Sequence, residues 1–337
     1  MYNTVHFWHM PRFVTFSRNV FIPLTNICRN RCGYCGFRRD ISHPEAALLS
    51  PEEVRDILDR GSRAGCCEAL FTFGERPEEV EGFMPMLNDF GYDDIIDYLL
   101  DLCNLSISIG LLPHSNPGIL EKKELEKLKP YNASMGLMLE TIGDIDAHHG
   151  CKGKSPEVRI KTIELAGELK IPFTTGILVG IGETWEERVR SLQKIKEIHE
   201  KFGHIQEVII QNFIPKPGTR MAASLAPGIK EMIKTVSMAR HILPEDVTIQ
   251  ISPNLIEPGA LIRSGASDLG GISPETIDHI NPESPWPGVE ELKNMINIPL
   301  RERLPIYPQY VKKMWFSNEI SCLIRKFSDT EGFRKTY

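Results

Sequence analysis

The sequence of 337 residues is poor in long apolar segments, and none of its runs approaches the roughly 18 residues that a membrane-spanning helix needs. Residues 1–16 are aromatic but are interrupted by His6, His9, Pro11 and Arg12, so they lack the apolar core of a signal peptide. An excess of positive charge is also missing, since the formal net charge is −6, whereas a general nucleic-acid binder needs a basic face. We therefore expect a cytoplasmic protein whose partner is a small molecule, with no nucleic acid and no membrane as partners.

Internal repeats and low-complexity tracts are also absent, so a fibrous or repetitive architecture is not expected. With 41% hydrophobic and 25% charged residues, the composition is that of a folded globular protein. The length is typical of one α/β barrel with terminal extensions. We expect a single domain over residues 1–337, with a core at about 16–300 and a C-terminal helical extension at 301–337.

Apolar runs of strand length alternate with amphipathic stretches, a pattern typical of βαβ units around a parallel sheet. Helix start signals lie between the runs, at Ser50, Ser155 and Thr184. The predicted fold is an α/β, TIM-type (β/α) barrel, near-complete at eight strands, in which chemistry is carried by loops at the C-terminal ends of the strands. The eight runs are 20–26, 68–74, 105–112, 132–140, 173–180, 205–213, 247–252 and a weaker one near 270–273.

Three of the eight cysteines, Cys28, Cys32 and Cys35, stand in a C-x3-C-x2-C pattern after the first run. Because a four-iron cluster normally takes four thiolates, a loop with three leaves one iron free to bind something else. A structural zinc site, which would lack a fourth ligand at loop spacing, and three unrelated buried thiols are the alternatives. The remaining cysteines are expected to be packing residues in a reducing compartment: Cys66, Cys67, Cys103, Cys151 and Cys322.

This spacing, with the aromatic Tyr34 directly before Cys35, resembles the cluster loop of the radical S-adenosylmethionine (SAM) superfamily. The resemblance implies a [4Fe–4S] cluster held by Cys28, Cys32 and Cys35, with SAM chelated to the open iron. In that superfamily one electron from the cluster breaks the S–C5′ bond of SAM and yields a 5′-deoxyadenosyl radical. The resemblance therefore predicts a radical-generating enzyme on the barrel.

Residues after the second and fourth runs resemble SAM-binding positions of the superfamily. Gly74-Glu75 resembles a glycine–glutamate motif that receives the methionine amine, although many members have two glycines there. Glu140 resembles the acid at the ribose or sulfonium end of SAM. Arg159, in the next helix, resembles an arginine that holds the SAM carboxylate.

The segment 176–183 matches the superfamily pattern G-x-I-x-G-x-x-E at its glycines and acid. The match implies that Gly180 and Ile181 lie at the adenine, with Ile181 packing on the ring. It also implies that Tyr34 contributes main-chain contact to the adenine edge.

Longer segments resemble one family within the superfamily, the first subunit of FO synthase (CofG), over roughly residues 16–300. The segments are 28–38, the loop through 148–149, 172–184, 211–219 and 267–273. The resemblance implies a carbon–nitrogen lyase of the ammonia-lyase type. Its substrate would be 5-amino-5-(4-hydroxybenzyl)-6-(D-ribitylimino)-5,6-dihydrouracil, which it would cyclise to the deazaflavin FO. The second subunit (CofH), as the source of this adduct, and an electron donor are implied as partners.

Polar residues near the strand ends are the candidates for handling this substrate. His148 or His149 could move the proton that leaves with ammonia, because histidine titrates near neutral pH. Asn212 is the third catalytic candidate. The candidate substrate-binding residues are Thr174, Thr175, Gln211, Gln250, Ser252, Asn254 and Asp268.

Two other classes of function stay open at this point. The second FO synthase subunit, biotin synthase and menaquinone-pathway enzymes share the cluster loop, and the physics of the sequence does not separate them. A non-catalytic iron–sulfur or zinc protein would satisfy its metal with protein ligands and would need no SAM-sized pocket. The glycine and acid motifs on the later strands argue against that second class.

Overall fold

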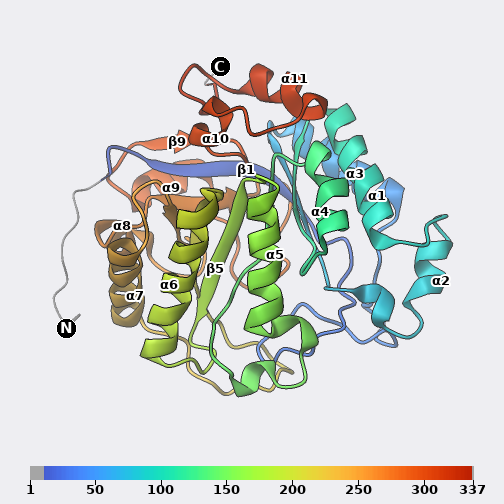
Figure 1. Cartoon of the computed structure of the whole chain (residues 1–337), viewed down its shortest axis with the longest axis horizontal. Coiled ribbons are helices and arrows are strands. Elements are labelled where there is room, and N and C mark those ends of the chain that lie inside the picture. Colours follow the sequence, from blue (N-terminus) through green and yellow to red (C-terminus); the bar gives the residue numbers. More distant parts are fainter. Residues whose placement is uncertain (1–10, 336–337) are drawn as a thin grey trace.

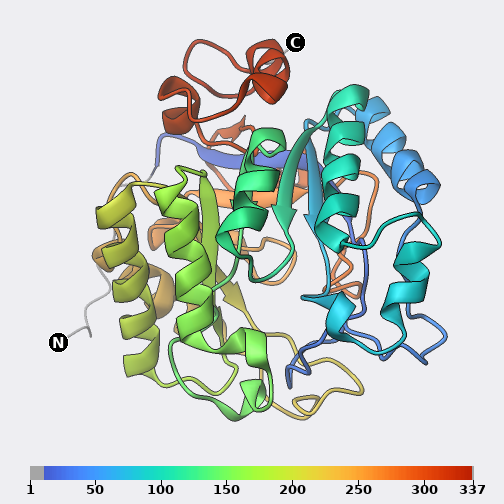
Figure 2. The same ribbon diagram turned by 45° about the vertical axis from the view of Figure 1, so that its right-hand side comes forward.

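Eight parallel strands form a closed barrel with helices around the outside (Figures 1 and 2). The strands neighbour one another in chain order from β2 to β8, and β1 closes the ring by pairing with both β8 and β2. The TIM-type barrel predicted from the sequence is therefore confirmed. The strands are β1 (Val14–Ile22), β2 (Glu68–Thr72), β3 (Leu112–Asn116), β4 (Ser134–Gly136), β5 (Phe173–Val179), β6 (Ile205–Asn212), β7 (Thr248–Gln250) and β8 (Asp268–Ile272).

This computed structural model describes residues 11–335. Two predictions therefore lie partly outside the described residues. They are the absence of a signal peptide, which concerned residues 1–16, and the single domain expected over residues 1–337. Within the described range, no helix combines the length and apolar character required to cross a membrane.

Local signals explain where several helices begin. Ser50 and Thr184 accept hydrogen bonds from the backbone three residues later and form capping boxes at α1 and α6, as predicted. Ser155 precedes α5 but makes no capping hydrogen bond to the backbone. The helices are α1 (Pro51–Arg63), α2 (Phe83–Asn88), α3 (Ile95–Ile109), α4 (Lys122–Leu128), α5 (Pro156–Glu168), α6 (Trp185–Phe202), α7 (Ile229–Ile242), α8 (Pro258–Arg263), α9 (Val289–Met295), α10 (Pro308–Lys312) and α11 (Asn318–Phe327).

Two of the predicted strand positions were wrong. Residues 105–109 end α3, because Asp94 caps that helix and Gly110, with φ of 100°, ends it, so the strand starts only at Leu112. The first strand starts at Val14, before the predicted 20–26, and it ends at Ile22. A short connection therefore separates β1 from Cys28.

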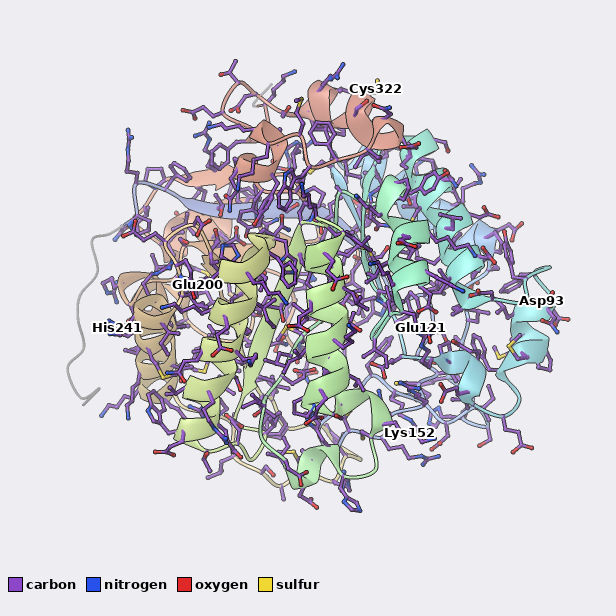
Figure 3. The ribbon with its side chains drawn as sticks, viewed as in Figure 1. Asp93, Glu121, Lys152, Glu200, His241 and Cys322 are labelled. Carbon is purple, nitrogen blue, oxygen red and sulfur yellow. The ribbon has the colours of Figure 1, made fainter. Side chains whose placement is uncertain are left out.

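The C-terminal segment packs on the barrel at the end opposite to the loop that carries Lys152 (Figures 1 and 3). It begins with β9 (Leu300–Glu302), a strand not predicted from the sequence, which pairs with the first half of β1. Cys322 lies exposed on α11 and is not a packing residue, which corrects the expectation for this cysteine. The cysteines that the structure buries, as expected, are Cys66, Cys67, Cys103 and Cys151.

A buried ion cluster ties this segment to the inside of the barrel. Arg303, only 4% exposed, donates hydrogen bonds to Asp268 of β8 at 2.7 Å and to Glu207 of β6 at 3.2 Å. Tyr307 donates its hydroxyl to Glu207 at 2.9 Å. Burial raises the pKa of Glu207 to about 8 even though Arg303 opposes the shift. The guanidinium thus satisfies carboxyl groups from two strands that would otherwise be buried without a cation.

We expect Arg303→Ala to lower the free energy of unfolding by about 3–5 kcal/mol, because it leaves buried carboxyl groups without their cation. Urea denaturation of the cluster-free protein measures the change. Lys293→Ala is the control, since Lys293 and Glu290 form an exposed pair, and it should cost less than about 1 kcal/mol. An Arg303→Ala variant as stable as this control would contradict the role given to the ion cluster.

Candidate active site

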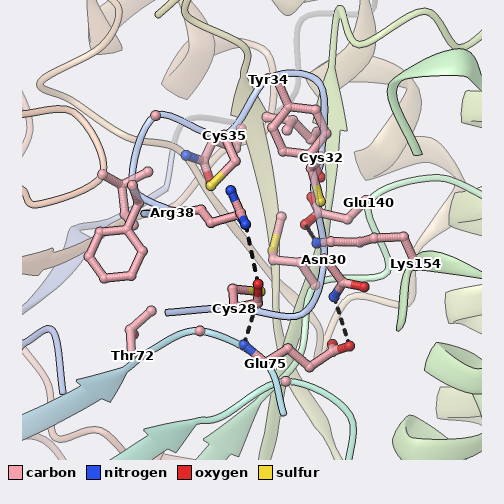
Figure 4. A pocket seen from close by; sticks show the side chains of 18 of the residues that line it. Cys28, Asn30, Cys32, Tyr34, Cys35, Arg38, Thr72, Glu75, Glu140 and Lys154 are labelled. Carbon is pink, nitrogen blue, oxygen red and sulfur yellow. Dashed lines mark hydrogen bonds and ion pairs between the residues drawn. The ribbon is translucent and has the colours of Figure 1, made fainter. Parts of the chain in front are cut away.

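The C-terminal ends of the strands surround a cavity of about 270 Å³, the upper chamber, and Cys28, Cys32 and Cys35 all line it (Figure 4). A second cavity of about 200 Å³, the lower chamber, extends toward the N-terminal ends of the strands. The two chambers share wall residues, so they lie next to each other between the cysteine loop and the inside of the barrel. The shared residues are Thr72, Asn116, Met138, Gln211, Ile280 and Asn281.

The cysteine loop is held against the loop that follows β2. The backbone N–H of Arg29 donates to the carbonyl of Glu75 at 3.1 Å, and the N–H of Glu75 donates to Cys28 Sγ at 3.2 Å (Figure 4). Gly74 permits this approach, because a Cβ there would lie 1.9 Å from the carbonyl oxygen of Ile27. One glycine before the glutamate is therefore enough for the loops to meet.

The three thiols of this loop are chemically suited to an iron–sulfur cluster, since all three are free and face one cavity. A hydrogen bond from Cys151, and then the charge of Lys154, lower the pKa of Cys32 to about 6, which favours the thiolate that a metal requires. Burial raises the pKa of Cys28 to about 11 and also raises that of Cys35. Among residues 11–335, no three His, Cys, Asp or Glu side chains already surround one metal position.

Two of the predicted SAM-binding residues, Glu75 and Arg159, meet at the wall of the upper chamber. Glu75 accepts a hydrogen bond from Asn30 at 2.8 Å and lies 3.4 Å from Arg159. Burial opposes ionisation of Glu75, but Arg159 and Asn30 outweigh it and lower the pKa of the carboxyl. Arg159 also donates to the carbonyl of Gly153 at 2.9 Å, so its guanidinium is held in place by groups on two sides.

A third predicted residue, Glu140, lies on the same wall in a left-handed conformation with φ of 66°. Such a backbone is uncommon for a residue with a side chain, and strained residues of this kind cluster at functional sites. Lys154 donates to Glu140 at 2.7 Å, and with Arg159 it lowers the pKa of this buried carboxyl against the effect of burial. Lys154 was not predicted as a site residue, although it stands in the segment that leads to Arg159.

The remaining predicted SAM contacts lie beside the cysteine loop. Tyr34 lines the upper chamber and packs in a small apolar cluster with Ile181, which is 1% exposed. The N–H groups of Gly180 and Ile181 donate to the carboxylate of Glu183 at 2.9 and 2.8 Å, which fixes the turn after β5. Gly180 has φ of 97°, so the turn needs a glycine there.

The two candidate histidines have different surroundings. His148 is buried and its Nε2 lies 3.0 Å from the hydroxyl of Tyr34. Burial lowers the pKa of His148 to about 4, so its ring is neutral at pH 7. His149 is exposed and lines an outer groove beside Cys32 and Cys35, not the upper chamber.

The structure brings only some of the polar candidates to the cavity. Asn212 lines the upper chamber, and its Oδ1 is buried with no hydrogen-bond partner in the described residues. Gln211 lines both chambers. Candidates that line the lower chamber alone are Thr174, Gln250 and Ser252.

Three other candidates lie elsewhere. Thr175 follows Thr174 on β5 and faces the other way, because side chains alternate along a strand. Asn254 donates to Asp278 at 2.9 Å. Asp268 is fully buried and is bonded to Arg303. The contacts of Asn254 and Asp268 are therefore structural, whereas the buried hydroxyl of Thr175 has no hydrogen-bond partner among the described residues. None of the three is part of either chamber wall.

Residues 273–288 are rich in proline and have no regular element, yet they reach the cavity. Ile280 and Asn281 line both chambers, and Lys216 donates to Asn281 at 2.8 Å. Residues 273–288 therefore form part of the walls of both chambers. They carry no motif and no regular element, so the sequence offered no signal for this role.

Comparisons with known proteins agree with this architecture. The family model of the radical SAM superfamily matches residues 22–195. The crystal structure of HydG, a maturase of the [FeFe]-hydrogenase, is similar with a TM-score of 0.69 and 17% identity over 94% of this chain and 70% of its own. Methylornithine synthase (PylB) is similar with a TM-score of 0.61 and 20% identity, covering 91% of this chain and 83% of its own. At these identities the solved structures support the fold alone.

Curated relatives are far more similar in sequence. A protein of Methanococcoides burtonii is 63% identical over 327 residues, which cover 97% of this chain and 99% of the relative. A protein of Archaeoglobus fulgidus is 53% identical and covers 96% of this chain and 99% of the relative. Both are named 7,8-didemethyl-8-hydroxy-5-deazariboflavin synthase. The chain therefore belongs to the radical SAM superfamily and, within it, to the family of 7,8-didemethyl-8-hydroxy-5-deazariboflavin synthases.

Proposed function

We propose that this protein cyclises 5-amino-5-(4-hydroxybenzyl)-6-(D-ribitylimino)-5,6-dihydrouracil to the deazaflavin FO, with release of ammonia, 5′-deoxyadenosine and methionine. The observation that carries the proposal is the 63% identity, over nearly the full chain, to a relative named for this synthase. The loss of ammonia makes the reaction that of a carbon–nitrogen lyase of the ammonia-lyase type. Two adjacent chambers, one beside the cysteine loop and one polar, are consistent with a cofactor and a substrate bound side by side.

The protein uses a [4Fe–4S] cluster and S-adenosylmethionine, as its family does. Cys28, Cys32 and Cys35 are the residues that would hold the cluster, through three thiolates. When bound and reduced, the cluster supplies the electron that cleaves SAM and so provides the radical chemistry of the family.

The charged groups on the upper wall suit the ends of a SAM molecule. Arg159 and Lys154 would attract its carboxylate, and Glu75 and Glu140 would accept hydrogen bonds from its amine and ribose. The apolar cluster of Tyr34 and Ile181 offers a dry surface for the adenine. Ionised carboxyl groups are required for these contacts, which agrees with the lowered pKa of both glutamates.

Asn212 and His148 are the proposed residues for substrate chemistry. The unpartnered Oδ1 of Asn212 is available to accept a hydrogen bond from the adduct and to fix its pose for ring closure. His148 is neutral, and its Nε2 lies 3.0 Å from the hydroxyl of Tyr34, which lines the upper chamber. The proton that the departing ammonia takes up would therefore reach the substrate from His148 through that hydroxyl. Neither histidine lines a chamber wall, but His148 contacts Tyr34, which does, whereas His149 is exposed.

The proposed partners follow from the reaction. The second FO synthase subunit (CofH) would supply the adduct, and an electron donor would reduce the cluster. We propose the cytoplasm as the compartment, because free thiols and an iron–sulfur cluster need reducing surroundings.

We expect Cys28→Ala, Cys32→Ala and Cys35→Ala each to abolish FO formation and to lower bound iron and sulfide to near background, because each removes one of three protein ligands. Iron and sulfide analysis after anaerobic reconstitution, together with FO fluorescence, measures both effects. Cys322→Ser, at an exposed cysteine on α11, is the matched control and should keep its iron. A cysteine variant of the loop that retains a full cluster and forms FO would refute the ligand assignment.

We expect Asn212→Ala to reduce FO formation by about ten- to a hundredfold while reductive SAM cleavage to 5′-deoxyadenosine continues, because the variant loses a positioning contact to the substrate only. Chromatographic quantification of both products separates the two steps. Asn104→Ala, on the exposed side of α3, is the control and should behave as the unmodified protein. Normal FO formation by Asn212→Ala would remove this residue from the scheme.

A further inference from the structure

We propose that the lower chamber binds the ribityl chain of the substrate through its hydroxyl groups, and that Glu68 at its wall makes the chamber reject the 5′-phosphate ester of that chain. The inference rests on the proposed function, because it names the part of the substrate that this chamber takes. It assigns a specificity-determining role to residues at the N-terminal ends of the strands.

Side-chain amides supply the chamber with groups that both donate and accept hydrogen bonds. The amides of Asn19, Asn116, Gln211 and Gln250 line it and make no side-chain hydrogen bond within residues 11–335. Gly271 leaves room for one of them, since a Cβ at this glycine would lie 2.0 Å from Nδ2 of Asn19. A chain of hydroxyl groups needs such partners, because each hydroxyl both donates and accepts and is costly to bury unpaired.

Two carboxyl groups add further partners for hydroxyl donors. Glu68 is 5% exposed and accepts one hydrogen bond on Oε2, from Ser17 at 2.5 Å. Glu207 accepts its hydrogen bonds from Arg303 and Tyr307 on Oε2 as well. In the described part of the chain no donor reaches the Oε1 atom of either glutamate, so both atoms are available to a ligand.

The charge of the chamber suits a neutral chain and not a phosphate. Asp268 behind the wall already takes up the guanidinium of Arg303, and Glu68 adds a further carboxyl group. Burial raises the pKa of both Glu68 and Glu207, which means that added negative charge is already unfavourable there. His114 on the same wall is neutral at pH 7, because burial lowers its pKa to about 3. Arg303 also lines this chamber but is already bonded to Asp268 and Glu207, and no other Lys or Arg of the described residues lines it. A phosphate group, with a charge of about −1.5 to −2, would therefore find no unpaired cation there.

The positions of the two chambers agree with a substrate whose ribityl chain lies in the lower chamber and whose rings lie nearer the cysteine loop. The cysteines line the upper chamber, and Gln211 and Asn281 lie where the chambers meet. With the ribityl chain in the lower chamber, the pyrimidine and hydroxybenzyl rings lie at the junction, beside Asn212. The reacting carbon atoms would then face the cofactor side of the cavity.

The test compares kcat/KM of the reconstituted enzyme for the adduct and for its 5′-phosphate ester, made by the same route. The unmodified protein should prefer the unphosphorylated adduct by at least about a hundredfold. Glu68→Gln keeps the size of the side chain and should reduce this preference by about tenfold, since it replaces a buried carboxyl group with an amide that can donate a hydrogen bond to a phosphate. Glu245→Gln, an exposed carboxyl outside the cavity, is the matched control and should leave the preference unchanged.

A second variant tests the hydroxyl contacts without altering charge. Gln250→Ala should raise KM for the adduct several-fold, leave kcat within about twofold, and keep the rejection of the phosphate ester. An adduct that carries a methyl group in place of the ribityl chain should show the same KM for this variant and for the unmodified protein. Equal KM increases with both adducts would show a general structural effect and would overturn the assignment of Gln250.

Failure of this inference differs from failure of the proposed function. Equal turnover of both adducts, or a preference unchanged in Glu68→Gln with normal iron content, would overturn the inference and leave FO synthesis standing. If neither adduct gives product while SAM cleavage is intact, the proposed function fails. Calorimetric titration of the protein with ribityl diaminouracil and with its 5′-phosphate then decides the inference separately, since tighter binding of the phosphate would refute it.

Discussion

Pairing of β1 with strands on both of its edges is the constraint on which the rest of the structure depends. The register places Asn19–Ile22 beside Glu68–Phe71, so the loops after β1 and β2 leave the barrel next to each other. Gly74 then lets these loops touch at Ile27, and the hydrogen bond from the Glu75 N–H to Cys28 Sγ follows from that contact. The position of the cysteine loop over the cavity is therefore a consequence of barrel closure.

Much of this arrangement could be predicted because its signals are local. The C-x3-C-x2-C pattern, the capping residues Ser50 and Thr184, and the apolar runs of β5 and β6 each depend on residues near one another in the chain. Residues 105–109 were misassigned for the opposite reason. Their alternating pattern suits a strand, but the helix that contains them begins far upstream at Asp94, where the capping side chain decides the outcome.

The polar part of the cavity was only partly predictable, because it depends on strand register and on distant segments. Side chains alternate along β5, so of two adjacent threonines only Thr174 reaches the cavity, and the sequence does not say which. The structural role of Asp268 was not predictable either. Its carboxyl group binds Arg303, which lies in a C-terminal segment that carries no motif. Lys154 ends a short 3-10 turn, and Asn281 lies in an irregular loop. The positions of both at the wall depend on tertiary contacts.

The two ends of the cavity differ in charge, and the chain segments that build them explain why. Loops at the C-terminal ends of the strands bring Lys154 and Arg159 beside Glu140 and Glu75, so this end has one cation for each of these two carboxyl groups. At the other end, Arg303 comes from the C-terminal segment and is consumed by carboxyl groups of the strands themselves. That arginine stabilises the barrel, and because no other Arg or Lys of the described residues lines the lower chamber, no unpaired positive charge remains there. The interaction that holds the C-terminal segment in place therefore also makes the lower chamber suited to neutral, hydroxyl-rich groups.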